Sequence, residues 1–175
     1  MYKLLTLFAL LWALSLAAYP NKQQATQDKE TEAKVFTPEV LLADGASLVD
    51  QKVELRGTVS HVCHHGGKKC FLAGKKPGVT IQVMAGGDIE AFDKKLIGSE
   101  IAVKGVVKEH RILKDVIEKQ EKAVKEKMSK EGCTEMERCS HVMSNVNQMK
   151  QWMTDNGKDY YPVYYVDATH YDAIQ

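Results

Sequence analysis

The strongest constraint on the fold is a hydrophobic period of two that begins at residue 52. In KVELRGTVSHVC the alternation places Val53, Leu55 and Val59 on one face of a strand. His61 and Cys63 continue that face. The same strand pattern recurs in CFLA (70–73), VTIQVMA (79–85), SEIAVKGVVKEH (99–110) and YYPVYYVDA (160–168). Five strands in 175 residues predict a single, mainly β domain with helices and a sizeable core.

Helical patterns precede and interrupt these strands. TPEVLLADGASLVDQ predicts a short helix with Thr37 as its cap and Pro38 at the first helical position. GGDIEAFDKKLIGS predicts a second helix that begins at Asp88 and ends at Gly98, because its apolar residues have helical spacing. The resulting order of three strands, a helix and two strands matches the OB-fold, a five-stranded Greek-key barrel.

Residues 110–157 are expected to form a helical hairpin inserted between the fourth and fifth strands. The second helix of the hairpin, through SHVMSNVNQMKQWM, is expected to stop at Asn156 and Gly157. In the first inserted helix, Glu and Lys at four-residue spacing account for the charged, solvent-facing side of the hairpin. The expected domain therefore spans 37–175. The apolar stripe of the first inserted helix consists of Leu113, Val116, Ile117, Val124 and Met128.

The N-terminus reads as a targeting segment. Residues 1–18 combine Lys3, an apolar run and small residues near Ala17, which is the pattern of a signal peptide. Residues 19–36 are polar and are expected to form a flexible leader. Since no cysteine lies near the cut, a lipoprotein anchor is excluded. We expect a soluble protein, exported to the periplasm or the extracellular space, with no transmembrane segment after signal removal.

The segments VELRGTVSHVC, CFLAG and GSEIAVKGVVKE resemble the tRNA-anticodon-binding-like OB domains of exported bacterial proteins. The resemblance covers residues 52–110 and the last strand. The insertion and the ending NGKDYYPVYYVDA also look like those of an uncharacterised periplasmic family of Bacteroidota. The resemblance implies an OB-fold. It leaves the function open, because that family includes nucleic-acid binders as well as proteins with small or unknown ligands.

The segment HVCHHGGKKC supports two chemistries. If Gly66 and Gly67 form a two-residue turn, Cys63 lies opposite Cys70 with Cα atoms about 4.5–5.5 Å apart. That distance suits a disulfide, and an even number of cysteines in an exported chain favours two of them. The same geometry directs two thiolates at one point, as in half of a zinc site. Both alternatives remain open at this stage.

The leading hypothesis is a non-enzymatic binding protein that holds a transition metal. OB-folds bind ligands with the loops after strands 1 and 4, and each of these regions contains one cysteine pair. Zinc suits thiolate and imidazole ligands. Five of the seven methionines lie in the insertion and offer Cu(I) as a variant, although their helical spacing fits core packing. The candidate metal ligands are Cys63, Cys70, Cys133, Cys139, His61, His64 and His141.

An alternative is a disulfide-stapled barrel that binds an oligonucleotide or a small anionic ligand. Residues 51–111 contain 11 Lys and Arg against 6 Asp and Glu, although the whole chain is balanced at +1. Single-strand binders also need aromatic platforms, and the tyrosines of the last strand suit a core as well as a platform. The candidate ligand-binding residues are Lys68, Lys69, Phe71, Lys75 and Lys76.

Catalysis finds little support in the sequence. The chain has no Gly-x-Ser-x-Gly, His-Glu-x-x-His or Cys-x-x-Cys motif, so we expect no enzyme. A thiol redox protein is the second alternative, since neighbouring histidines and lysines lower the pKa of a cysteine.

Overall fold

The computed structural model describes residues 34–129 and 135–174, which belong to one compact unit, Glu32–Gln175. The predicted signal peptide and most of the predicted leader lie outside these residues. The elements in chain order are β1 Val35–Phe36, α1 Pro38–Leu48, β2 Lys52–Val62, β3 Lys69–Ala73, β4 Thr80–Ala85, the 3-10 helix η1 Lys94–Leu96, β5 Glu100–Leu113, α2 Lys114–Met128, α3 Met136–Asn156 and β6 Tyr160–Ala173.

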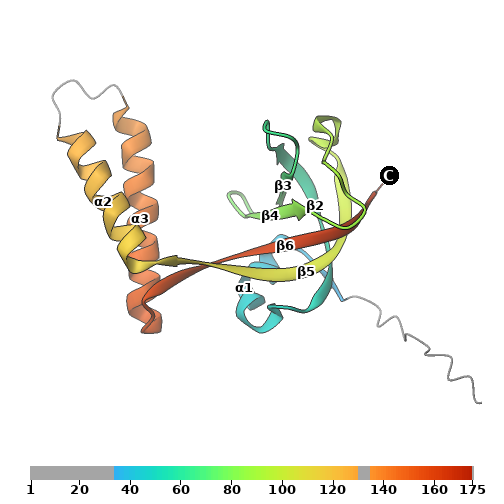
Figure 1. The fold of residues 1–175 in the computed structure, drawn as a ribbon, viewed down its shortest axis with the longest axis horizontal. Coiled ribbons are helices and arrows are strands. Elements are labelled where there is room, and N and C mark those ends of the chain that lie inside the picture. Colours follow the sequence, from blue (N-terminus) through green and yellow to red (C-terminus); the bar gives the residue numbers. More distant parts are fainter. Residues whose placement is uncertain (1–33, 130–134, 175) are drawn as a thin grey trace, which may run out of the picture. The chain divides into compact units, whose positions relative to one another are not determined.

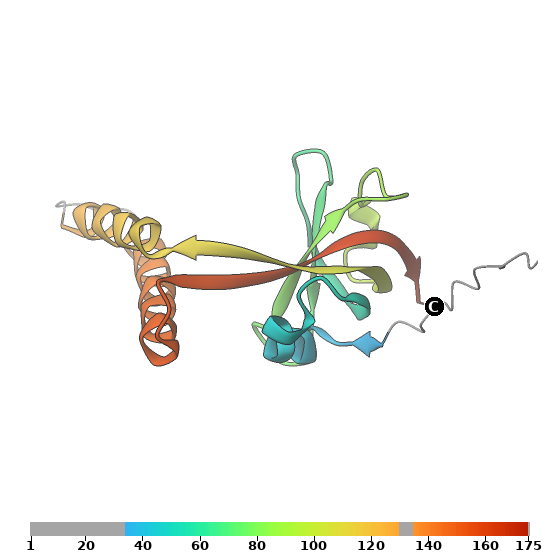
Figure 2. The same ribbon diagram turned by 60° about the horizontal axis from the view of Figure 1, so that its bottom comes forward.

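Five strands close into a barrel. β2 pairs with β3, β3 with β4, and β5 with both β6 and β2, in each case antiparallel. β4 pairs with β6 in parallel, which completes the ring. The five strands therefore follow the OB-fold order, and α2 and α3 are inserted between its last two strands (Figures 1 and 2). The predicted OB-fold and the predicted position of the helical insertion are confirmed.

The strand alternation fills the barrel with apolar side chains. Val53, Leu55 and Val59 of β2 are buried, as predicted. The ladder between β2 and β3 then shifts by one residue after Val59, so that Val62 enters the core and His61 is exposed. The predicted position of His61 on the buried face is wrong, because a β-bulge changes which side chains face inward.

Of the two helices predicted beside the barrel, the first is confirmed and the second is wrong. α1 begins after Thr37 with Pro38 at its first turn, as predicted. The predicted helix over 88–98 is wrong, and this segment contains only the short helix η1. Its backbone bonds instead to other parts of the barrel: the Asp88 N–H donates to the Thr169 carbonyl, and the Phe92 N–H donates to the Gly67 carbonyl. These bonds replace the helical ones.

β5 and β6 are 14 residues long and continue past the barrel as a two-stranded arm that ends in α2 and α3 (Figure 1). The helical hairpin has its own small core of Ile117, Val146 and Met153. Part of the stripe predicted for the first inserted helix faces solvent, since Val116 of α2 is about half exposed. Leu113, also about half exposed, is the last residue of β5 rather than part of the helix. The predicted end of the second helix is confirmed at Gly157, whose left-handed conformation caps α3.

Two residues of the predicted leader belong to the fold. Val35 and Phe36 form β1, which pairs in parallel with β2, and the Phe36 side chain is buried. Among the residues that the structure describes, no helix is long and apolar enough to cross a membrane.

Candidate binding site

The segment HVCHHGGKKC forms the turn between β2 and β3, but not in the predicted register. Val62, rather than Cys63, lies opposite Cys70. The Cys63 N–H donates to the Lys69 carbonyl at 2.8 Å, and the Gly67 N–H donates to the Cys63 carbonyl at 3.3 Å. The turn therefore spans four residues instead of two. The predicted register, with Cys63 opposite Cys70 in the ladder, is wrong, and both cysteines are free thiols.

Much of this segment serves to hold the turn. Gly67 has a positive φ of 62°, and a side chain there would approach the Phe92 carbonyl within 2.7 Å. The Gly67 carbonyl accepts from the Phe92 N–H at 2.8 Å, and Lys68 Nζ donates to the Glu90 carbonyl at 2.5 Å. Together these bonds fasten the β2–β3 turn to the segment after β4, so the turn is a fixed part of the barrel.

Cys70 lies in the barrel core with no exposed surface. Burial among apolar side chains raises the pKa of its thiol to about 12. A thiol in this environment stays protonated near neutral pH. It is therefore a poor nucleophile and a poor metal ligand in this conformation.

The other predicted metal ligands are spread over two parts of the unit. His61 and His64 have ring centroids 5.5 Å apart at the β2–β3 turn. Cys139 is buried and His141 is exposed, both on α3, which packs against α2 and β6. Cys133 lies outside the described residues. Within residues 34–129 and 135–174, no three His, Cys, Asp or Glu side chains form a group able to hold a metal.

The strand register lines up four side chains across the outer surface of the barrel. His61 pairs with Phe71, and Phe71 pairs with Gln82. Gln82 pairs in turn with Tyr165 of β6. Phe71 and Gln82 each lie between two buried residues of their strand, so their side chains point out of the barrel. We call His61, Phe71, Gln82 and Tyr165 the outer row; it spans about 14 Å across four strands.

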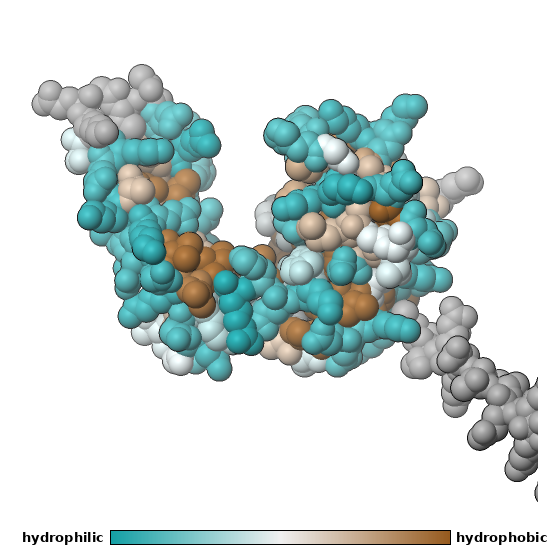
Figure 3. Space-filling view, viewed as in Figure 1, coloured by the Kyte–Doolittle hydropathy of each residue, from teal (hydrophilic) through white to brown (hydrophobic). Residues whose placement is uncertain are grey.

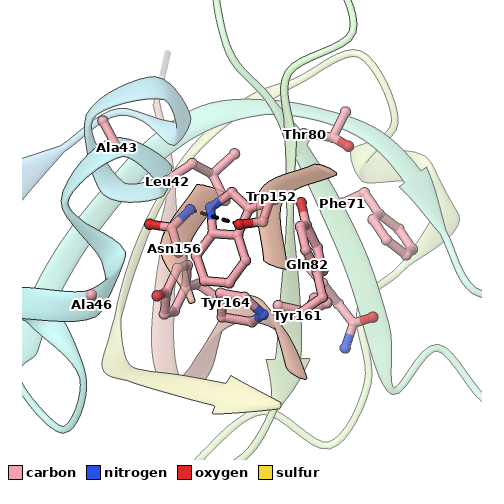
Figure 4. A pocket seen from close by; sticks show the side chains of 12 residues that line it. Leu42, Ala43, Ala46, Phe71, Thr80, Gln82, Trp152, Asn156, Tyr161 and Tyr164 are labelled. Carbon is pink, nitrogen blue, oxygen red and sulfur yellow. Dashed lines mark hydrogen bonds between the residues drawn. The ribbon is translucent and has the colours of Figure 1, made fainter. Parts of the chain in front are cut away.

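A pocket of about 620 Å³ adjoins the outer row and includes two of its members, Phe71 and Gln82. α1, β3, β4, α3 and β6 all contribute side chains to its wall (Figure 4). In the space-filling view, the surface is hollowed between the helical hairpin and the barrel, and apolar side chains gather near the base of the hairpin (Figure 3). The pocket is thus built from the barrel and from the insertion together.

Four aromatic side chains line the pocket. Trp152 of α3 stands against the Tyr161 ring at 5.5 Å, nearly perpendicular to it. The Asn156 side-chain amide donates to the Trp152 carbonyl at 2.8 Å and helps to hold the end of α3 (Figure 4). Tyr164 packs against Gly45 of α1, where a larger residue would collide with its ring. With Phe71, the rings of Trp152, Tyr161 and Tyr164 make four aromatic side chains in the pocket wall.

The polar side chains of the wall carry no formal charge. Thr80, Gln82 and Asn156 supply a hydroxyl and two amides, and every described residue lining the pocket is uncharged near neutral pH. Burial, followed by the nearby carboxylate of Glu109, raises the pKa of Tyr164, so its hydroxyl stays protonated. The pocket therefore presents ring faces and neutral hydrogen-bonding groups.

The predicted ligand-binding lysines lie in different environments: some help to hold the turns of the barrel, and others are exposed. Lys68 is bound to the segment after β4, as described above, whereas Lys69 is exposed beside Phe71 on β3. Lys75 and Lys76 lie in the β3–β4 turn. The Lys76 N–H donates to the Glu39 carboxylate at 2.8 Å, which ties this turn to α1. Of the predicted residues, only Phe71 lines the pocket.

Sequence reasoning missed most of the pocket because its residues come from five separate elements. A usable signal existed in YYPVYY. In an OB-fold the last strand lies beside the third, so Tyr161 and Tyr165 share the face next to Gln82. Of these two, Tyr161 lines the pocket. The position of Trp152 depends on the length of the arm, which the sequence pattern underestimates.

No protein-family model matches the sequence, and no curated protein sequence matches it either. Among solved structures, the chain is similar to a candidate aspartyl-tRNA synthetase from Leishmania major Friedlin. The two are 18% identical, with a TM-score of 0.33, over 49% of this chain and 18% of that chain. The chain thus spans about a fifth of the length of that structure. The OB-fold assignment rests on strand order and closure.

Proposed function

We propose that this is an exported, non-enzymatic OB-fold binding protein that holds a ring-bearing ligand in the pocket between the barrel and α3. The observation that carries the proposal is the convergence of four aromatic rings and three uncharged polar side chains on one pocket. Small-molecule sites typically combine apolar and aromatic walls with a few polar groups, in volumes of about 300–1,000 Å³. Export rests on the signal-like residues 1–18.

The place of the pocket in the barrel also supports binding. OB-folds bind ligands on the face of strands 2 and 3 and on the loop between strands 4 and 5. In this chain that face is formed by β3 and β4, and the helical hairpin takes the place of the loop. Phe71 and Trp152 come from these two regions and meet in the same pocket.

Trp152 provides a direct readout of binding. Trp12 lies in the predicted signal peptide, so Trp152 is the only tryptophan of the processed chain, residues 19–175. In that chain we expect the Trp152 emission to shift when a ligand binds. The probes are short neutral oligosaccharides and a single-stranded oligo-dT.

The site assignment is tested by matched glutamine variants. Gln82→Ala removes a pocket amide, whereas Gln148→Ala removes an exposed glutamine of α3 that does not line the pocket. We expect Gln82→Ala to weaken binding at least about tenfold, as for loss of one or two hydrogen bonds, and Gln148→Ala to leave it unchanged. Binding that is insensitive to Gln82→Ala and Thr80→Val would place the site elsewhere and contradict the proposal.

A further inference from the structure

Resting on the proposed binding function, we infer that the pocket and the outer row bind an uncharged oligosaccharide chain. The inference names a ligand class for that site, and three sets of observations carry it: the neutral wall, the pairing of the nearby cations, and the continuation of the rings beyond the pocket.

The wall has the chemistry that a sugar requires. The C–H face of a pyranose ring is apolar and packs on an aromatic face, and Trp152 and Tyr161 offer such rings. The hydroxyls around the sugar ring need hydrogen-bond partners of both kinds. Gln82 and Asn156 can each donate and accept, and Thr80 adds a hydroxyl. Each of these groups is neutral, so an uncharged ligand loses no ionic hydration on binding.

Three cations on the elements beside the pocket are paired with acids, whereas Lys69 is exposed next to Phe71. Lys108, opposite Tyr165 in the ladder, contacts Asp50 at 2.7 Å. Arg111, opposite Pro162, contacts Glu109 at 2.9 Å.

On α3, Lys150 contacts Glu121 of α2 at 2.7 Å. A phosphate-bearing strand is attracted by cations that lack an acidic partner. The Lys108 and Arg111 pairs are neutral as a whole, while Lys150 shares Glu121 with Lys125. The two neutral pairs lower the positive potential beside the pocket, which favours a neutral chain over a nucleic acid.

Rings continue from the pocket across the barrel surface. The Phe71 ring lies 5.9 Å from the His61 ring, and the His61 ring lies 5.5 Å from that of His64. Successive rings at this spacing provide packing surfaces outside the pocket for further sugar units. A single sugar would leave them uncovered, so the site fits a chain of several units.

The test uses the processed chain, residues 19–175, on an array of neutral, acidic and sulfated glycans, followed by titration of the same protein. We expect retention on neutral oligosaccharides. The affinity measured by Trp152 emission should change less than about twofold between about 50 and about 500 mM salt, because no phosphate or other ion pair forms.

Two variants separate the pocket from the row. Gln82→Ala should weaken binding of short and long oligosaccharides alike. His61→Ala, which removes an exposed ring outside the pocket, should weaken only the longer chains. Gln148→Ala serves as the control that leaves both unchanged.

Two kinds of result would contradict the inference, and they affect the proposed function differently. If oligo-dT binds with a strong loss of affinity in high salt, and neutral glycans do not bind, the carbohydrate inference is wrong while the pocket function stands, provided that Gln82→Ala weakens that binding. Retention of acidic or sulfated glycans alone also overturns the inference. If no glycan and no oligo-dT changes the Trp152 emission, both the inference and the proposed function fail.

Discussion

The two cysteines of the β2–β3 turn differ in environment although only six residues separate them in the chain. Cys63 is partly exposed at the turn, whereas Cys70 is enclosed in the barrel and its pKa is raised to about 12 by burial. We therefore expect iodoacetamide to modify Cys63 in the native protein and Cys70 only after denaturation. Mass spectrometry of the labelled peptides gives the answer. Rapid native labelling of Cys70 would contradict this placement.

The zinc site stays a prediction, and zinc binding would require a change in the environment of Cys70. To bind zinc, the Cys70 thiol has to leave the core and lose its proton. If Cys63 and Cys70 are ligands, alanine at either position must lower the zinc content of the purified protein. A zinc content of one ion per chain that survives both substitutions contradicts the predicted ligand set.

Glu39 provides a prediction on pH. The N–H of Lys76 donates to its carboxylate and lowers its pKa from 4.5 to about 2. Because the folded-state pKa is lower, this stabilisation is present above pH 4.5 and is lost as the pH falls towards 2. Glu39→Gln should lower the urea midpoint near neutral pH and reduce its fall on acidification. Equal acid sensitivity in Glu39→Gln and the parent would contradict this role; Asp44→Asn on the same helix is the control.

At the scale of elements, Gly45 decides how closely α1 approaches the barrel. Alanine is normally preferred over glycine inside a helix by about 0.5–1 kcal/mol. At this position, however, the added methyl group would overlap the Tyr164 ring. Overpacking of this kind typically costs about 1–3 kcal/mol, so we expect Gly45→Ala to destabilise the protein by about 1–2 kcal/mol in urea unfolding.

The mechanism can be checked by making room for the methyl group. Combining Gly45→Ala with Tyr164→Val removes the ring that the methyl group would meet. The double variant should then show a smaller effect of Gly45→Ala than the parent does. If the effect is equal in both backgrounds, the ring contact is not the cause.

Glu121 connects the two inserted helices. Its carboxylate accepts from Lys125 of α2 and Lys150 of α3, each at 2.7 Å, and these bonds lower its pKa from 4.5 to about 2. Glu121→Gln should lower the thermal midpoint of the hairpin above pH 4.5, and its effect should shrink as the pH falls towards 2, where the parent carboxylate takes up its proton. Glu118→Gln is the control, because the ion pair of Glu118 within the described residues is with Lys114 on its own helix. Equal shifts in both variants would contradict the bridge.

The elements themselves were predictable where a local pattern decides the structure. The proline at the start of α1, the alternation of β2 and the glycine that ends α3 each act within a few residues. The segment 88–98 was mispredicted because its apolar spacing fits a helix while its backbone is bonded to distant residues. The bulge after Val59 depends on pairing with β3, so the sequence of β2 alone does not reveal it.

The candidate site was predictable only in part for the same reason. Phe71 follows from its place on the second strand of an OB-fold. Tyr164 and Trp152 reach the pocket through long-range packing, one against α1 and the other at the end of the arm. The cysteines and histidines of the turn drew attention by their chemistry, but much of that segment serves to fix the backbone of the turn.

At the scale of the whole described unit, two hydrophobic cores are joined by the β5–β6 arm. The barrel core contains side chains such as Leu55, Leu72 and Val166, and the hairpin core contains Ile117, Val146 and Met153. Cores that share few contacts can unfold separately. Trp152 packs in the hairpin core, so its emission reports the hairpin, while far-ultraviolet circular dichroism also reports the barrel.

Val146→Ala should therefore affect the hairpin first. Removing part of a fully buried valine costs about 1–3 kcal/mol. We expect the Trp152 transition to move to lower denaturant while the barrel transition stays in place. Leu72→Ala in the barrel should do the reverse, with a cost of about 2–5 kcal/mol. If each variant shifts both transitions equally, the two cores unfold as one.

Ligand binding should couple the two cores, because the pocket takes Phe71 and Gln82 from the barrel and Trp152 and Asn156 from the hairpin. A ligand that contacts both stabilises only the state in which both are folded, by about 2.7 kcal/mol at one hundred times its Kd. We expect a saturating oligosaccharide to move the Trp152 transition of the Val146→Ala variant towards that of the barrel. With Gln82→Ala the same concentration should have little effect. A ligand that shifts only the barrel transition would show that α3 does not take part in binding.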